Sequence, residues 1–244
     1  NKKTDQLNQY DKKKVEIYQQ KLVLEDLLKT AARVGINSLN DREAIIKNID
    51  NANMETYKVP NDLQNLILLD QKLHTAITQL NEDIKVKETT LKTDITTLKG
   101  EIEKVVKTLD TTRIEGESLD VALLSTTTIL NSAKESLQKD FSKEVKAMDL
   151  LSLESLLGQI NAEIKTLTDK ITENKNKKYQ DIKAEKKILE DLENQTIALG
   201  INTKEEHKQI SEILKMSDDN ILKNFTTYTA TINGKIQTLQ LQVD

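Results

Sequence analysis

The sequence predicts an all-α fold, an elongated antiparallel helical bundle or coiled-coil rod with an internal duplication. Three observations support this prediction. Aliphatic residues recur at three- and four-residue spacings over long stretches, as they do on one face of a helix. The 244 residues include only six glycines and one proline, which leaves few turn signals for a many-stranded β fold. Aromatic residues make up 3% of the chain, so aliphatic side chains must form most of the core.

The duplication is most visible in a short stretch that occurs twice. "VGINSLND" covers Val34–Asp41 and "LGINTKEE" covers Leu199–Glu206, so that Gly35 and Gly200 lie 165 positions apart. Glycine just past a helix end adopts left-handed dihedral angles at little cost, and the isoleucine after it can pack back on the last turn. Each stretch therefore predicts the end of one helix and a sharp corner.

The residues after each corner predict the start of the next helix. Ser38 and Thr203 are candidate N-caps, and each is followed three residues later by an acidic residue, Asp41 or Glu206. This spacing is that of a capping box, in which the two side chains and backbone N–H groups exchange hydrogen bonds. Asn202, like its counterpart in the first stretch, is expected to turn the chain.

The similarity extends to both sides of the corners. "VLEDL" (Val23–Leu27) and "ILEDL" (Ile188–Leu192) precede the two glycines at the same distance. Downstream, five apolar positions align at a separation of 159: Leu66, Leu69, Leu73, Ile77 and Leu80 with Phe225, Tyr228, Ile232, Ile236 and Leu239. We interpret residues 1–112 as a first helical unit (helix, Gly-Ile-Asn corner, short helix, long helix). Residues 113–149 are then a linking helix, and 150–244 a second unit homologous to the first. Both ends of the sequence fall within this pattern, which predicts a segment of a longer repeat array.

In the first half, apolar periodicity predicts a helix over Asp5–Val34 and a short helix over Leu39–Asn51. The segment Asn51–Asp62 is the clearest loop, with Pro60 at a first-turn position of the next helix. A long helix is expected over Leu63–Leu109, and its apolar pattern changes phase between Ile84 and Leu91 as a stutter in a coiled coil does.

In the second half, Gly116 is expected to break the pattern, with Ser118 as the candidate N-cap of a helix that carries apolar residues from Leu119 to Met148. Another long helix is expected from about Leu150. Thr172–Lys178 contains no apolar residue, so it is either a solvated stretch of continuous helix or the loop of a hairpin. A short helix over Lys204–Met216 and a last helix from Asp218 complete the prediction.

The charge distribution argues against nucleic acid as a partner. The chain has 36 Lys and Arg against 40 Asp and Glu, a formal net charge of −4, which gives no broad attraction to a polyanion. The densest basic stretch, Lys175–Lys187, is interrupted by Asp181 and Glu185, and Tyr179 is its single aromatic residue. Binding of single strands needs several aromatic residues in a positive groove. We therefore expect a solvated helix face.

The sequence predicts no stable membrane span. No unbroken apolar run is longer than Leu66–Leu69, far below the about 20 residues that cross a bilayer. Leu119–Ala133 is the best candidate for a segment that enters a bilayer after rearrangement, the alternative being a buried helix of the bundle. The chain has no cysteine, which slightly favours a secreted or cell-surface location, although a cytosolic one agrees with it as well.

No residue is predicted to be catalytic, cofactor-binding or metal-binding. The two histidines, His74 and His207, lack the spacing to a second histidine or acid that a zinc site uses, and we expect both at the surface or the edge of a seam. Pairs of acidic residues such as Glu25 and Asp26, or Glu190 and Asp191, are expected to pair with lysine along exposed helix faces. The sequence thus predicts a protein that is not an enzyme and carries no cofactor.

The leading functional hypothesis is a non-enzymatic structural or protein-interaction module. In this hypothesis a helical rod acts as a spacer, scaffold, or filament or surface subunit, and binds protein partners along its helix faces, including copies of itself or adjacent repeats. Two alternatives stay open at this point. One is a membrane-active helical toxin or translocator, and the other is the extracytoplasmic sensor bundle of a receptor.

Overall fold

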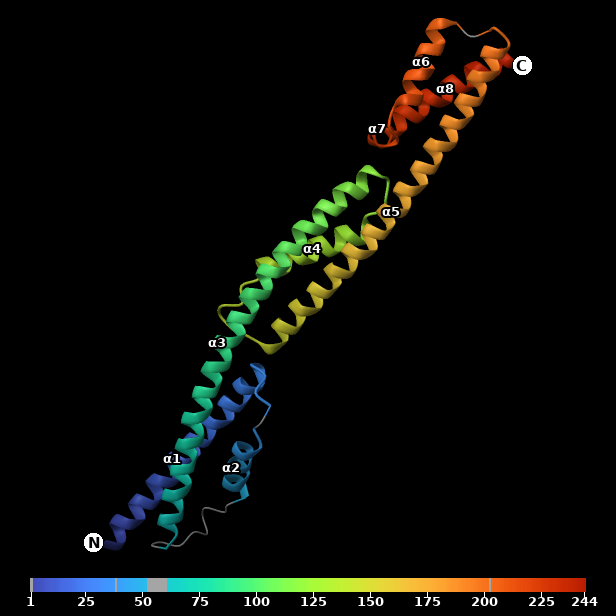
Figure 1. The fold of residues 1–244 in the computed structure, drawn as a ribbon. Coiled ribbons are helices and arrows are strands. Elements are labelled where there is room, and N and C mark those ends of the chain that lie inside the picture. Colours follow the sequence, from blue (N-terminus) through green and yellow to red (C-terminus); the bar gives the residue numbers. More distant parts are fainter. Residues whose placement is uncertain (1, 38, 52–60, 202) are drawn as a thin grey trace. The chain divides into compact units, whose positions relative to one another are not determined.

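The computed structural model describes residues 2–37, 39–51, 61–201 and 203–244. Within these ranges the chain forms helices and no strand, which confirms the predicted all-α helical bundle. The helices, shown in Figure 1, are α1 (Lys2–Arg33), α2 (Asn40–Asn51), α3 (Asn61–Ser118), α4 (Leu124–Gln138), α5 (Ala147–Ala198), α6 (Lys204–Lys215), α7 (Asp218–Lys223) and α8 (Phe225–Val243). Residues 52–60, with the expected loop and Pro60, lie outside the described residues.

The helices pack into two compact units. Unit 1 consists of residues 1–106 and 131–160, and unit 2 of residues 107–130 and 161–244. In unit 1, α1 and α2 lie beside the first part of α3, and in unit 2, α6 and α8 lie beside the last part of α5 (Figure 1). The limits differ from the sequence units 1–112, 113–149 and 150–244, because α3, α4 and α5 each contribute residues to both compact units.

The two Gly-Ile-Asn stretches lie at equivalent bends. Gly35 has a φ of +86° and Gly200 a φ of +67°, the left-handed conformation that the sequence predicts. Ile36 N donates to Ala31 O at 2.9 Å, and Ile201 N donates to Thr196 O at 3.0 Å. Together with the hydrogen bonds of the glycine N–H groups, these are the bonds of a Schellman motif at the end of α1 and of α5. Ser38 and Asn202 lie outside the described residues.

The predicted capping box after the second corner is confirmed. The N–H of Glu206 donates to Thr203 Oγ1 at 3.3 Å, and the N–H of Thr203 donates to Glu206 Oε2 at 3.4 Å. These bonds satisfy two N–H groups at the start of α6 that have no partner within the helix. The local sequence therefore fixes both the end of α5 and the start of α6.

Buried side chains recur every seven residues along the long helices. They are Tyr10, Ile17, Leu24 and Ala31 in α1, Leu66, Leu73 and Leu80 in α3, and in α5 first Leu153, Ile160 and Leu167 and then Ile182, Leu189 and Thr196. The strict seven-residue spacing is interrupted twice. Ile95 lies 15 residues (95 − 80) after Leu80, with Ile84 and Leu91 buried between them, and Ile182 lies 15 residues (182 − 167) after Leu167, with Ile171 buried between them. One heptad with two four-residue steps has this length, as in a stutter. The phase slip predicted between Ile84 and Leu91 falls within the first of these intervals.

The predicted break at Gly116 is wrong, because α3 continues to Ser118. A Cβ on Gly116 would lie 3.3 Å from side-chain atoms of both Leu123 and Leu167, so the glycine allows close packing within a helix. Ser118 does not cap a following helix: its hydroxyl donates to Glu115 O at 2.6 Å. The helix ends at Ser118, and the turn that follows it contains Asp120.

Asp120 takes the role that a glycine plays at the other two corners. Its φ is +58°, and Val121 N donates to Gly116 O at 3.0 Å, as in a Schellman motif. Aspartate tolerates left-handed dihedral angles better than most residues, since its short polar side chain can bond locally. A corner without glycine gives little signal in the sequence.

The helix expected over Leu119–Met148 is also shorter than predicted. It covers only α4, and residues 139–146 form an irregular connection before α5 begins at Ala147. In this connection the N–H of Ser142 donates to Asp140 Oδ1 at 2.8 Å, and the N–H of Lys146 donates to Asp149 Oδ2 at 3.2 Å. These side-chain acceptors favour a turn and a new helix start over a continuous helix.

Between the alternatives for Thr172–Lys178, the structure shows continuous helix, since α5 extends unbroken from Ala147 to Ala198. The last predicted helix is divided: α7 ends at Lys223 and α8 begins at Phe225. Asn224, between them, has non-helical dihedral angles of −126° and 46°. The hairpin alternative is therefore wrong, and the single last helix is two.

Alanine in place of Gly35 is expected to destabilise the protein more than alanine in place of Gly200. Both changes put a side chain into the left-handed region, at a cost of about 1–2 kcal/mol. At Gly35 the new Cβ would also lie 3.0 Å from Ala147 Cβ, whereas at Gly200 it meets nothing within 4 Å. Urea unfolding of the two variants measures the difference, and an equal loss of stability would show that Ala147 does not constrain the first corner.

Candidate functional site

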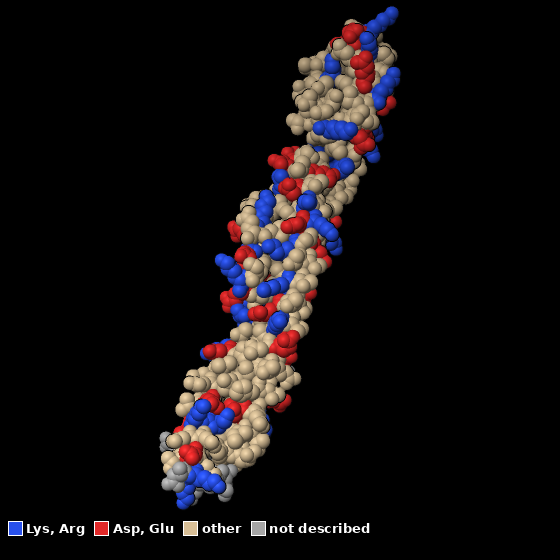
Figure 2. Space-filling view, turned by 90° about the vertical axis from the view of Figure 1, so that its left-hand side faces the viewer, with Lys and Arg blue, Asp and Glu red and all other residues tan. Residues whose placement is uncertain are grey.

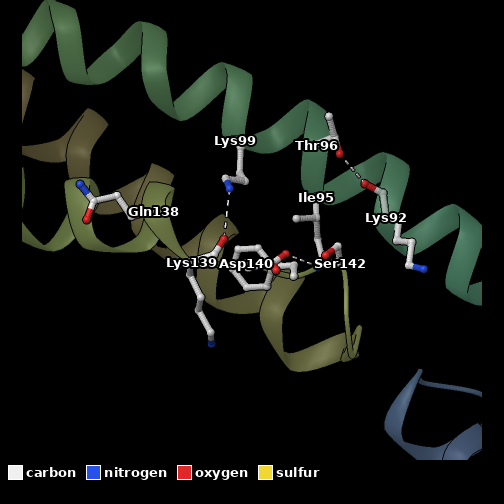
Figure 3. Close-up of a pocket in the computed structure, with 9 residues that line it drawn as sticks. Lys92, Ile95, Thr96, Lys99, Gln138, Lys139, Asp140 and Ser142 are labelled. Atoms are coloured by element: carbon white, nitrogen blue, oxygen red, sulfur yellow. Dashed lines mark hydrogen bonds between the residues drawn. The ribbon is translucent and has the colours of Figure 1, made fainter.

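Unit 1 has a groove where α4 leads into α5. Its volume is about 490 Å³. One wall is formed by α3, through Lys92, Ile95, Thr96 and Lys99, and the other by the end of α4 and the following connection, through Gln138, Lys139, Asp140, Phe141 and Ser142. Figure 3 shows Lys99 directed from α3 towards the backbone carbonyl of Lys139, with which its ammonium group forms a 3.2 Å hydrogen bond.

Phe141 is half-buried in this groove and lies close to two cations. The ammonium nitrogens of Lys99 and Lys139 lie 5.5 Å and 5.2 Å from the centre of its ring. Each distance is within the range of a cation–π interaction, in which the electron-rich face of the ring attracts positive charge. The groove therefore combines an aromatic surface with local positive charge.

Asp140 supplies negative charge at the same place. Hydrogen bonds from the hydroxyl and the backbone N–H of Ser142 lower the pKa of Asp140 below its usual value, and the charge of Lys99 contributes. A carboxylate with a lowered pKa is a weak general base. The groove therefore presents charges of both signs around Phe141.

The two histidines lie elsewhere, and each contacts a buried carboxylate. His74 in α3 pairs with Asp70 one turn earlier, at 3.4 Å, and His207 in α6 pairs with Glu193 of α5. Both imidazole rings are more than half exposed, as expected for surface positions. Asp70 also accepts a hydrogen bond from Lys13 of α1 at 2.9 Å. The contacts of Lys13 with Asp70 and of His207 with Glu193 join neighbouring helices.

The approach of His207 to Glu193 could not be predicted, because the two residues lie on different helices and have no regular spacing in the sequence. The pairing of His74 with Asp70 could have been predicted from the sequence, since residues four apart on a helix are neighbours. Among the described residues there is no group of three or more His, Cys, Asp or Glu side chains that could hold a metal ion.

The basic stretch Lys175–Lys187 lies on α5, and several of its lysines have acidic partners. Lys177 pairs with Glu173 at 2.8 Å, Lys178 with Asp120 at 3.1 Å, and Lys186 with Asp218 at 2.8 Å. On the face of the molecule in Figure 2, acidic and basic side chains are interspersed. The pattern agrees with the solvated, mixed-charge surface expected from the sequence.

The second part of the segment Leu119–Ala133 belongs to α4, which packs with the other helices as the buried-helix alternative expects. Thr126 is fully buried and its hydroxyl donates to Glu163 Oε1 of α5 at 2.6 Å, while the hydroxyl of Ser125 donates to the same oxygen at 2.8 Å. Over the part of the chain that the structure describes, no helix is both long and apolar enough to cross a membrane.

A partly buried carboxylate, that of Glu185, makes the stability of unit 2 depend on pH. Burial raises the pKa of Glu185 above its usual value of 4.5, the charge of Asp181 adds to the shift, and a hydrogen bond from Asn233 opposes it. The raised pKa means that the folded state favours the protonated form of Glu185. The stability that this protonation contributes is fully present below the pKa that Glu185 has in the unfolded chain. It is lost as the pH rises through the higher folded-state pKa.

Glutamine in place of Glu185 is therefore expected to raise the free energy of unfolding at pH 7 and to change it little below about pH 4. Urea unfolding at the two pH values measures this difference. Glu190→Gln, an exposed change on the same helix, is the control. If Glu185→Gln changed the free energy of unfolding equally at both pH values, burial of the charged carboxylate would not explain the change.

The comparisons with known proteins give no relative. The sequence matches no protein-family model, no curated protein and no solved structure. The class of protein that the fold defines is an all-α helical bundle, and its function is inferred from its own geometry.

Proposed function

We propose that the chain is a non-enzymatic structural or protein-interaction module, in which long paired helices act as a spacer, scaffold, or filament or surface subunit. The observation that carries the proposal is the seven-residue repeat of buried positions along α1, α3 and α5. This repeat is typical of coiled-coil packing, in which a narrow seam holds the helices together. Helices held together by such a seam can be much longer than the diameter of a compact core.

Helix length supports the role of a spacer. At 1.5 Å per residue, the 58 residues of α3 extend about 87 Å and the 52 residues of α5 about 78 Å. Narrow seams also leave much of each helix surface exposed to other proteins. On α1, Leu7, Val15, Tyr18 and Leu22 are exposed and their spacings place them on one face. Exposed apolar residues gathered on one face favour contact with another protein.

We further propose that the two units contain copies of one helix–corner–helix element. Positions 165 apart are buried alike at Ile17 and Ile182, and at Leu24 and Leu189. Positions 159 apart are buried alike at Leu73 and Ile232, and at Leu80 and Leu239. These pairs support a repeated architecture, the arrangement by which array proteins stack similar elements.

Small-angle X-ray scattering tests the proposed spacer role. The largest dimension of the protein in solution is expected to be at least about 87 Å, because a particle cannot be shorter than its longest helix. A compact domain of 244 residues has a radius of gyration of about 18 Å. A measured value near that would contradict the proposal.

A further inference from the structure

The contact of His207 with Glu193 joins α6 to α5 in unit 2. Glu193 lies in α5 with an exposed fraction of 6%, and His207 lies in the first turn of α6 with its Nδ1 against Glu193 Oε1. This oxygen is buried and accepts no hydrogen bond from the part of the chain that the structure describes. A buried carboxylate without a charged partner costs free energy. The charge of Glu193 therefore depends on the neighbouring imidazole for compensation.

The charge of an imidazole changes near neutral pH. Histidine ordinarily titrates near pH 6.5, whereas glutamate does so near pH 4.3. At about pH 6 an imidazole beside a carboxylate therefore carries a positive charge, and their contact is an ion pair. At about pH 8 the imidazole is neutral, and the carboxylate keeps its negative charge. The ring of His207 is more than half exposed, so protons reach it from solvent while the protein stays folded.

The other charged groups around this contact have different partners or are exposed. Glu206 of α6 accepts a hydrogen bond from Gln242 of α8 at 3.4 Å. Lys235 of α8 donates to Gln209 of α6 at 2.6 Å, and not to Glu193. The remaining charged residues within one turn of the contact on α5 and α6, and at the end of α8, are exposed: Glu190, Asp191, Lys204, Glu205, Lys208 and Asp244.

Unit 1 has a permanent cation at the position that corresponds to His207. Arg42, 165 positions earlier (207 − 165), lies in the first turn of α2, and its Nη2 donates to Asp83 Oδ2 of α3 at 2.8 Å. Leu28, 165 positions before Glu193 (193 − 165), is apolar and packs against the core of unit 1. Arginine stays protonated at every pH at which the protein is folded. The contact that holds α2 in unit 1 therefore does not depend on the protonation of its cation.

We propose that the contact of His207 with Glu193 is a pH-sensitive latch, which holds α6 on α5 when the imidazole is protonated and loosens when it is neutral. The folded state gains from protonation because the buried carboxylate then has a cationic partner. The stability contributed by the latch is therefore present below the range in which histidine titrates, and it is lost as the pH rises through that range. Since the latch acts within unit 2, it does not depend on the proposed spacer role.

Hydrogen exchange of the α6 amides in the full-length protein tests the latch. Protection factors, which correct for the effect of pH on intrinsic exchange, are measured at pH 6 and pH 8. In α6 they are expected to fall about fivefold from the lower to the higher pH. The amides of α2, which Arg42 holds, are expected to change less. Because Glu185 also makes unit 2 depend on pH, every variant keeps Glu185 and is compared with the unmodified protein.

Three variants separate the latch from other effects of pH. His207→Arg supplies a permanent cation, so protection of α6 at pH 8 is expected to become as high as at pH 6. His207→Gln is expected to give low protection at both pH values. Glu193→Leu removes the buried charge and is expected to remove most of the pH difference from the other side of the contact. His74→Gln is the control, because His74 lies on α3 and its loss should leave the response of α6 unchanged.

Two results would overturn the proposal. One is equal protection of α6 at pH 6 and pH 8 in the unmodified protein. The other is a fall in protection as large in His207→Arg or Glu193→Leu as in the unmodified protein, since the pH dependence would then arise from another group. Circular dichroism checks that each variant folds, and two variants on opposite sides of the contact keep the test decisive if one of them does not.

Discussion

Replacement of Leu24 by alanine is expected to destabilise unit 1 by about 2–5 kcal/mol. Leu24 is fully buried in the core of this unit, among Ile17, Leu73, Leu80 and other aliphatic residues. Loss of its branched side chain removes apolar contacts and leaves a cavity, which a seam between rigid helices can fill only in part. A core with few aromatic residues depends strongly on each such side chain.

Leu22, two residues away on the same helix, provides the control. Its exposed fraction is 61%, and Leu22→Ala is expected to change the free energy of unfolding by less than about 0.5 kcal/mol. Urea unfolding followed by circular dichroism measures both variants, and hydrogen exchange of the α1 amides assigns the loss to unit 1. Similar effects of the two substitutions would show that α1 does not pack through the seam described above.

Proline in place of Asn176 is expected to destabilise unit 2 by about 3 kcal/mol or more. Asn176 lies in the polar stretch of α5 and its side chain is exposed, so the side chain itself contributes little to the core. Within a helix, proline removes one backbone hydrogen bond and clashes with the preceding turn. In a loop the same change would cost far less.

Asn176→Ala is the matched control, and it is expected to be neutral or slightly stabilising because alanine favours a helix more than asparagine does. Thermal unfolding of the two variants gives the comparison. If Asn176→Pro were as stable as the unmodified protein, Thr172–Lys178 would be the loop of a hairpin.

The regular parts of the fold could be predicted because their causes are local. Aliphatic spacing indicated the helices. Gly35 and Gly200 indicated the ends of α1 and α5, and Thr203 with Glu206 indicated the start of α6. A left-handed glycine and a capping box depend on a few neighbouring residues, so the sequence carries the whole signal. The helical class follows from the same residues.

The remaining features depend on contacts between distant residues. Gly116 is helical because the side chains of Leu123 and Leu167 fill the space beside it, and Asp120 forms the corner in place of glycine. The groove at Phe141 forms because α3 brings Lys99 to the connection after α4. Such sites lack a sequence motif, and their geometry appears only when the helices are paired.

The central claim is that α3 is one continuous helix that passes through Gly100 and Gly116. Because the chain has no native cysteine, spin labels can be attached to single cysteines at two exposed positions, Leu68 and Ile114. These positions are 46 residues apart, so a double electron–electron resonance measurement is expected to give a distance of about 69 Å. The pair Leu151 and Ile197 in α5, also exposed and 46 residues apart, should give the same value. A main distance below about 50 Å between the labels on α3 would mean that the helix is broken, and would contradict the claim.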